Sequence, residues 1–240
     1  IESGDELAIL TGSFDHMKGE IGRLIEDIRQ EQNQRRVMEL QLLQEQINPH
    51  FLYNTLDTIV WMAEFNDGQR VVDLTKSLAK YFRLALNQGQ EQIRLQDEID
   101  HVRQYLFIQK QRYGDKLNYE ILEEGTLGDY QLPKLVLQPL VENAIYHGIK
   151  EMDRPGMIRV TSEIREEQVV LTIYDNGRGF ALSESTDQTL LRLGGVGVKN
   201  VDQRLRLQFG ASYHMEIDSK ANSYTKITLY LPLTSRDEHS

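Results

Sequence analysis

The feature of this 240-residue sequence that most constrains its fold is a change of apolar periodicity at Gly114. Before Gly114, apolar residues recur every three or four positions, which is the spacing of amphipathic helices. After it, apolar and polar residues alternate over residues 157–164 and 169–174, which is the spacing of strands. The sequence therefore predicts a helical N-terminal part followed by an α+β C-terminal part.

The helical part is expected to contain four helices, over residues 5–30, 38–65, 71–86 and 95–113. The first has the two-in-seven apolar spacing of a coiled coil, with a solvated helix face as the alternative. The turn string Asn66-Asp67-Gly68 joins the second helix to the third, so these two fold back as a hairpin. Trp61, Tyr81 and Phe82 are expected to pack this hairpin, and His101 to lie on the surface.

The C-terminal part is expected to form one mixed sheet with helices on one face. Its predicted strands cover residues 117–122, 157–164, 169–174, 213–217 and 225–231. Its predicted helices cover residues 133–149 and 198–209. The hydrophobic content of 40% is enough to fill at least one core.

Composition excludes several kinds of function. The chain has no cysteine, which excludes disulfides and thiolate chemistry. Its net charge of −10 argues against a nucleic-acid partner. No apolar run approaches the length of a membrane span, which needs about 20 residues. Because the sequence begins at Ile1 without an initiator Met, we expect it to be part of a longer protein.

Pro49 and His50 stand side by side inside a long helical pattern. A proline within a helix removes a backbone donor and costs about 3 kcal/mol or more, so a kink is expected there. The kink would turn the His50 ring toward solvent, where a neutral imidazole nitrogen is a competent nucleophile. A histidine that only caps or packs a kinked helix is the alternative.

Three further segments carry residues suited to a nucleotide. On a predicted helix, Asn143 and His147 lie four residues apart and share a face, and an amide oxygen is a ligand that suits Mg²⁺. A predicted strand ends at Asp175, where a carboxylate can accept the exocyclic amine of adenine, and Gly177 and Gly179 follow it. Taken singly, the first segment also fits an ordinary polar helix surface, and the second also fits a β-turn.

The third segment is rich in glycine. Gly195 and Gly197 precede a predicted helix that carries Asn200 and Arg204. Backbone amides at such a helix start can cradle an anion, although a flexible glycine hinge is the alternative. The segment lacks the Gly-Lys-Ser/Thr order of a Walker loop.

In this order, the three segments resemble the N, G1 and G2 boxes of the Bergerat ATP-binding fold, which histidine kinases, gyrase, Hsp90 and MutL share. Asn-Pro-His-Phe-Leu-Tyr-Asn at 48–54 and Leu-Gln-Pro-Leu-Val-Glu-Asn-Ala-Ile-Tyr-His-Gly at 137–148 look specifically like the LytS/YesM-type sensor histidine kinases. The string Arg-Tyr-Gly-Asp-Lys at 112–116 is similar to one in that family. The resemblance covers residues 38–233, and the segment that starts at Gly4 resembles the second helix of a HAMP linker.

The resemblance implies an α+β fold with four parts. They are the C-terminal helix of a HAMP-like linker (1–30), a dimerisation and phosphotransfer hairpin (31–90), a connecting helix (91–114) and a Bergerat-type α/β sandwich (115–235). Two hairpins would form a four-helix bundle in a homodimer. The chain would be the cytoplasmic portion of an integral membrane receptor, attached to the cell membrane only through a missing N-terminal part.

The resemblance also implies a site. His50 would accept the phosphoryl group, Asn143 would hold Mg²⁺, and Asp175 would recognise the adenine of ATP. The other residues expected to contact the nucleotide are His147, Gly177, Gly179, Gly195, Gly197, Asn200 and Arg204. Residues 181–193 would form a lid over it.

The function implied is ATP-dependent autophosphorylation followed by transfer to an aspartate on the receiver domain of a response regulator. A nucleotide-binding pseudokinase or scaffold and a Bergerat-fold ATPase are the alternatives. Phe51 stands where many histidine kinases carry an acidic residue, so no general base is identified. Pro139 stands where the hydrolases carry a glutamate, which disfavours the ATPase.

Overall fold

The computed structural model describes residues 49–85, 92–125, 127–150, 152–181 and 196–233. The chain divides into two compact units between Leu52 and Tyr53, and the description below concerns the second unit, apart from the start of the first described helix. The coiled-coil segment expected over residues 5–30 lies outside the described residues, and so does the N-terminal side of the kink expected at Pro49.

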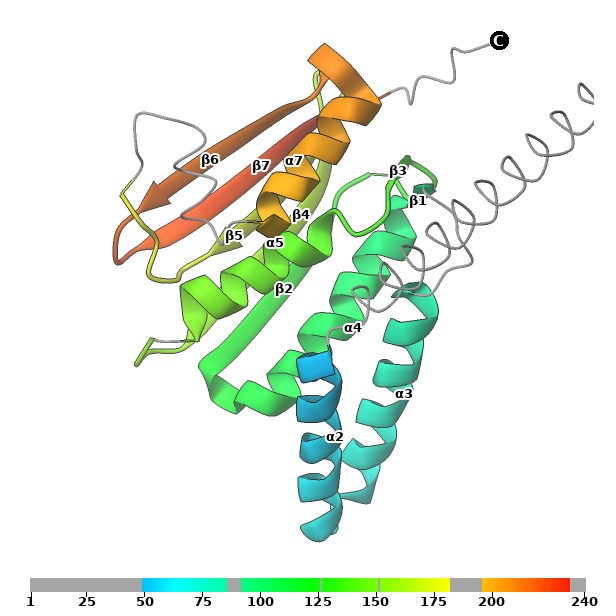
Figure 1. Ribbon diagram of the computed structural model, residues 1–240, viewed down its shortest axis with the longest axis vertical. Helices are drawn as coiled ribbons and strands as arrows, with labels where there is room; N and C mark the ends of the chain where they lie inside the picture. The colour runs from blue at the N-terminus through cyan, green and yellow to red at the C-terminus, as the bar shows by residue number, and fades with distance from the viewer. Residues whose placement is uncertain (1–48, 86–91, 126, 151, 182–195, 234–240) are drawn as a thin grey trace, which may run out of the picture. The chain divides into compact units, whose positions relative to one another are not determined.

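The predicted helical hairpin is confirmed. Helix α2 (Pro49–Glu64) and helix α3 (Gly68–Ala85) run antiparallel and are joined by a short turn, as Figure 1 shows. In this turn Asn66 adopts a left-handed conformation with φ of 57°. Asp67 then caps helix α3, because its carboxylate accepts a hydrogen bond from the backbone N–H of Arg70 at 3.4 Å.

Helix α4 (Leu95–Tyr113) packs against helix α3 and ends at Gly114, whose φ of 57° fits its predicted role as the terminating residue. The expectation for His101 is wrong: its side chain is buried, and its ring stacks on that of Tyr81 with centroids 4.5 Å apart. Burial lowers the pKa of His101 to about 4, so the imidazole is neutral at pH 7.

The expectation for Trp61 is also wrong, because 56% of it is exposed. Its ring lies beside that of Phe65, 4.8 Å away between centroids, and Phe65 is exposed as well. Tyr81 is buried as expected, but it packs on helix α4 through His101 and Tyr105. Phe82 is half-buried. Helix α2 therefore leaves part of its apolar surface uncovered.

The C-terminal part is a five-stranded mixed sheet with helices on one face (Figure 1). In sheet order the strands are β2 (Leu117–Glu123), β4 (Gly156–Arg165), β5 (Gln168–Asp175), β7 (Tyr224–Pro232) and β6 (His214–Lys220). The covering elements are helix α5 (Leu137–Asn143), the π-helix η2 (Ala144–Ile149) and helix α7 (Val196–Phe209). Strand β2 pairs parallel with β4, and the other neighbours pair antiparallel. The predicted α+β sandwich is confirmed.

The smaller elements connect these layers. Strands β1 (Gln92–Arg94) and β3 (Gln131–Pro133) form a separate antiparallel pair, and two 3₁₀ turns are η1 (Gly114–Lys116) and η3 (Gly210–Ser212). The core lies between the sheet and the helices. It is built from alternate strand residues and the inner helix faces, namely Ile158, Val160, Leu171, Ile173, Ile227, Leu229, Leu140, Val141, Ile145, Val201 and Leu205. Burying each such side chain contributes about 1.5–3 kcal/mol.

The helix predicted to start at Pro133 starts four residues later. Pro133 ends strand β3, and Leu135 has a φ of 57°, which no helix accommodates. The carboxylate of Glu98, on helix α4, accepts hydrogen bonds from the backbone N–H groups of Leu135 at 2.9 Å and Leu137 at 2.8 Å. Glu98 is fully buried, so helix α5 receives its N-terminal cap from a distant helix.

We predict that Glu98→Gln destabilises the fold. The carboxamide keeps one acceptor oxygen but turns an NH₂ group toward backbone donors, leaving at least one buried N–H without a partner. The expected loss is about 2 kcal/mol, or a melting temperature lower by roughly 4–8 °C, measured by thermal unfolding. Glu120→Gln, at an exposed ion pair with Arg159, is the control and should shift the melting temperature little. Equal shifts in both variants would contradict the capping role.

Candidate functional site

Two neighbouring cavities lie on the helix-covered side of the sheet. The Asp175 cavity, of about 210 Å³, is lined by Asn143, His147, Gly148, Asp175, Arg178, Gly179, Phe180 and Thr225. The Gly197 cavity, of about 230 Å³, is lined by Pro139, Glu142, Asn143, Tyr146, His147, Gly197 and Val198. Asn143 and His147 line both, so they form a shared wall between the two spaces.

The two residues of the shared wall lie on either side of a change from α-helix to π-helix. Asn143 is the last residue of helix α5, and His147 lies in the π-helix η2 that continues it. A π-helical turn within an α-helix is rare and occurs often at functional sites. The wider turn still brings both side chains to the same cavities.

Asp175 ends strand β5 and is only 4% exposed. Two glycines allow this: a Cβ on Gly148 would lie 2.6 Å from the Asp175 Oδ1 atom, and one on Gly177 would overlap the same oxygen. The backbone N–H of Gly177 donates to Oδ1 at 2.9 Å. Burial raises the pKa of Asp175 to about 7, and the bond from Gly177 opposes that rise. The carboxylate is therefore a buried acceptor that titrates near neutral pH.

Gly179 has a structural reason to be glycine. Its φ is 52°, and a Cβ there would overlap the backbone oxygen of Lys220 and approach that of Tyr224 to 2.5 Å. The loop after strand β5 can therefore pack against the turn between β6 and β7 while it lines the Asp175 cavity. Gly197 is different, since among the described residues a Cβ there would meet only Pro139, at 3.7 Å.

The remaining predicted residues divide into two groups. Gly195 and the expected lid beyond Ala181 lie outside the described residues. Asn200 and Arg204 lie on helix α7, and neither is among the lining residues of the two cavities. The Arg204 Nη2 atom instead donates to the backbone oxygen of Leu135 at 2.7 Å, so this side chain supports the loop before helix α5. Contact of Asn200 and Arg204 with a nucleotide stays a prediction.

His50 is exposed on helix α2, in the unit that ends at Leu52. Sequence reasoning missed Thr225, which is 5% exposed, lines the Asp175 cavity and pairs in register with Asp175. Its only sequence signal is a polar residue on the inward side of an apolar strand. Sequence reasoning also missed Glu142, which lines the Gly197 cavity.

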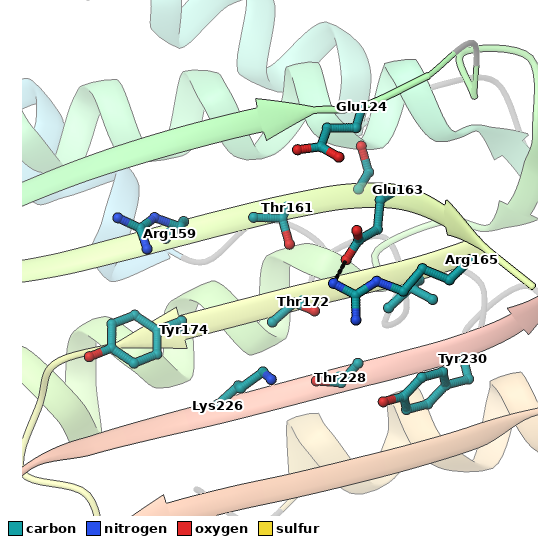
Figure 2. A pocket seen from close by; sticks show the side chains of 12 residues that line it. Glu124, Arg159, Thr161, Glu163, Arg165, Thr172, Tyr174, Lys226, Thr228 and Tyr230 are labelled. Atoms are coloured by element: carbon teal, nitrogen blue, oxygen red, sulfur yellow. Dashed lines mark ion pairs between the residues drawn. The ribbon is translucent and has the colours of Figure 1, made fainter. Parts of the chain in front are cut away.

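A third hollow, of about 320 Å³, lies on the uncovered face of the sheet and contains none of the predicted site residues (Figure 2). Its central residues are Thr161, Thr172 and Thr228, which stand in register on three neighbouring strands. Two arginines that line it are held in ion pairs, Arg159 with Glu120 at 2.8 Å and Arg165 with Glu163 at 2.7 Å. Because none of the predicted site residues lines this hollow, the other two cavities are the candidate site.

Two properties of the described residues bear on metals and membranes. These residues contain no group of three or more histidine and acidic side chains that could hold a metal ion. An amide oxygen such as that of Asn143 can bind a cation together with oxygens of a ligand, which is the way Mg²⁺ commonly binds with nucleotides. None of the described helices is long and apolar enough to span a membrane.

Comparison with known proteins identifies two family regions in the chain. Residues 38–117 match the family described as histidine kinase. Residues 128–235 match the family described as histidine kinase-, DNA gyrase B- and HSP90-like ATPase. The first region contains His50 and the hairpin, and the second contains both cavities.

Three relatives span both regions. The sensor histidine kinase YesM of Bacillus subtilis (strain 168) is 34% identical over 230 residues, which is 95% of this chain and 39% of YesM. The sensor histidine kinase BtsS of Escherichia coli (strain K12) is 37% identical over 83% of this chain and 34% of BtsS. The sensor protein LytS of Bacillus anthracis is 32% identical over 81% of this chain and 34% of LytS.

The chain spans between a third and two fifths of the length of these relatives. A solved histidine kinase domain from Erythrobacter litoralis EL346 shares 17% identity over 81% of this chain and 93% of that chain, with a TM-score of 0.47. The family assignment rests on the sequence relatives and on the two matched regions. This chain belongs to the LytS/YesM-type sensor histidine kinases of two-component systems.

Proposed function

We propose that this chain binds Mg²⁺-ATP in the two adjoining cavities and phosphorylates itself on His50. The observation that carries the proposal is the shared wall of Asn143 and His147, with Asp175 on one side of it and Gly197 on the other. Residues far apart in the sequence thus supply a buried acceptor, an amide oxygen and a helix start to one site. These are the groups that an adenine, a hydrated cation and a phosphate chain require.

Each group has a distinct task in the proposal. The Asp175 carboxylate accepts a hydrogen bond from the adenine amine in a cavity that already excludes water from most of the side chain. The phosphates lie toward the Gly197 cavity, at the N-terminal end of helix α7. Asn143 supplies an oxygen to Mg²⁺, which neutralises phosphate charge, and His147 can donate to a phosphate oxygen.

In the proposed reaction, an imidazole nitrogen of His50 bonds to the γ-phosphorus of ATP as the bond to ADP breaks. Phosphoryl transfer of this kind depends mostly on positioning of the reactants and on stabilisation of charge, and the rest of the protein forms no covalent bond in it. Pro139 lines the Gly197 cavity and stands at the sequence position where a hydrolase carries its glutamate, so the residue at that position cannot act as a base. This favours a histidine acceptor over steady ATP hydrolysis.

The proposal includes two partners. Helix α2 and the turn after it expose large apolar side chains, namely Tyr53, Leu56, Val60 and Trp61 on the helix and Phe65 in the turn. Contiguous apolar surface of this kind marks an interaction site, and we propose that a second copy of the chain covers it. The phosphoryl group would then pass from His50 to an aspartate on the receiver domain of a response regulator. The chain would act as the cytoplasmic portion of a membrane receptor.

The first test is labelling with γ-³²P-ATP and Mg²⁺. We expect label that is stable in alkali and labile in acid, as a phosphohistidine is. His50→Gln should abolish it because the nucleophile is gone, and Asn143→Ala should reduce it by more than tenfold through loss of the metal ligand. His214→Gln, at an exposed histidine of strand β6, should keep full labelling. Label that survives in His50→Gln would overturn the proposal.

The second test concerns the dimer. Val60→Glu places a charge in the centre of the apolar side of helix α2, where burial without a partner is costly. We expect the variant to be monomeric by light scattering at concentrations where the wild-type chain is dimeric. Leu207→Glu is a matched control, because Leu207 is an 87% exposed leucine on helix α7. A dimer in Val60→Glu as stable as that of the control would contradict this interface.

The third test uses the pKa of Asp175. Because that pKa is about 7 when folded and about 3.9 when unfolded, ionisation costs stability as pH rises from about 4 to 7, and the cost is constant above. The difference corresponds to about 4 kcal/mol at pH 8, so Asp175→Asn should raise the melting temperature there by as much as roughly 8–16 °C, and by less at pH 5. It should also weaken ATP binding about tenfold, because a charged acceptor is lost.

Asp129→Asn, at an exposed carboxylate, is the control for this test and should change neither quantity. In the wild-type chain, ATP binding should weaken as the pH falls below about 7 and the Asp175 carboxylate becomes protonated. A gain in melting temperature that is equal at pH 5 and pH 8 would show that ionisation of Asp175 is not its cause.

A further inference from the structure

A buried polar chain connects helix α3 of the hairpin to the wall of the Gly197 cavity. The Nε2 atom of Gln138 donates hydrogen bonds to the Tyr81 hydroxyl at 2.7 Å and to the Glu142 Oε1 atom at 2.8 Å. Tyr81 belongs to helix α3, whereas Gln138 and Glu142 belong to helix α5. One amide nitrogen therefore bonds the hairpin on one side and a residue of the cavity wall on the other.

The orientation of this amide is fixed. Only the NH₂ end of Gln138 can donate to a carboxylate, so Glu142 determines which end faces it. Tyr81 is 2% exposed and its ring stacks on His101, so its hydroxyl is held in place by packing. Burial raises the pKa of Tyr81 well above its usual value, with a smaller contribution from the charge of Glu142, so the hydroxyl stays neutral. Gln138 is itself only 8% exposed.

The hydrogen-bond chain ends at Glu142 and fixes the position of its carboxylate. Glu142 lines the Gly197 cavity together with Asn143 and Gly197, at the end of the site where the phosphates would lie. A carboxylate that turned into this space would repel phosphate oxygens in a setting of low dielectric constant. The bond from Gln138 ties it instead to the amide that also bonds the Tyr81 hydroxyl of helix α3.

We propose that Gln138 is a positioning residue of the nucleotide site. Anchored by the Tyr81 hydroxyl, it holds the Glu142 carboxylate away from the space for the phosphate groups. This role rests on the proposed function of the two cavities as an ATP site. Because Tyr81 lies on helix α3, the same contact links the packing of the hairpin to phosphate binding, and linkage makes that coupling reciprocal.

The test compares the affinities of two ligands for the whole chain by calorimetric or NMR titration. Gln138→Met removes the donor and keeps the side-chain length. We expect it to weaken binding of the ATP analogue AMP-PNP with Mg²⁺ about tenfold, the value of one hydrogen bond to a charged group. Adenosine, which has no phosphate, should bind within about twofold of wild type because the Asp175 cavity is intact. Tyr81→Phe should act in the same direction with a smaller effect.

Two further variants separate positioning from general damage. Tyr105→Phe is the matched control: its hydroxyl is also buried nearby, but it accepts from Gln109 at 2.8 Å, so AMP-PNP affinity should not change. Adding Glu142→Gln to Gln138→Met removes the negative charge of the Glu142 carboxylate, which Gln138 would otherwise hold away from the phosphates. This double variant should recover AMP-PNP affinity to within about twofold of wild type.

Each outcome decides the proposal. Selective loss of AMP-PNP affinity with recovery in the double variant supports it. Equal losses for AMP-PNP and adenosine, or no recovery when Glu142 is neutral, would overturn it while leaving the ATP site itself in place. A wild-type chain that binds neither ligand would overturn the proposed function, and this role with it.

Discussion

The carboxylate of Glu98 is the interaction on which the arrangement of the site depends. It is fully buried on helix α4 and accepts the backbone N–H groups that open helix α5. Arg204 of helix α7 donates to the carbonyl of Leu135 in the same loop, so helices α4 and α7 both hold the start of helix α5. Because helix α5 carries Asn143 at its other end, the position of the shared cavity wall follows from this cap.

The buried carboxylate of Asp175 lowers the stability of the folded chain but provides a hydrogen-bond acceptor for a ligand. A carboxylate that is 4% exposed, with a pKa raised to about 7, destabilises the folded chain at neutral pH. The fold nevertheless places it at a strand end and uses Gly148 and Gly177 to bring backbone close around it. Locally unfavourable groups that the surroundings hold in place are common at functional sites, and here the acceptor is prepared before any ligand arrives.

The hairpin and the nucleotide-binding part are joined by more than chain connectivity. Helix α3 packs on helix α4 through Tyr81 and His101, and it reaches helix α5 through the hydrogen bond from Gln138. Under the proposed function, the state of the hairpin and the occupancy of the ATP site must influence each other. A short buried hydrogen-bond chain is a physical route for that coupling, because its members cannot exchange their bonds for water without repacking the helices.

The sequence by itself determined the element types, since the periods of 3.6 and 2 residues are local properties, and it identified Asn143, His147 and Asp175, which the fold brings to adjoining cavities. Only the tertiary structure decided where helix α5 starts, because its cap, Glu98, comes from 39 residues earlier in the chain. The burial of His101 and the exposure of Trp61 were likewise decided by which helix packs against which. Local pattern sets what an element can be, whereas the partners of buried polar groups are set by contacts distant in sequence.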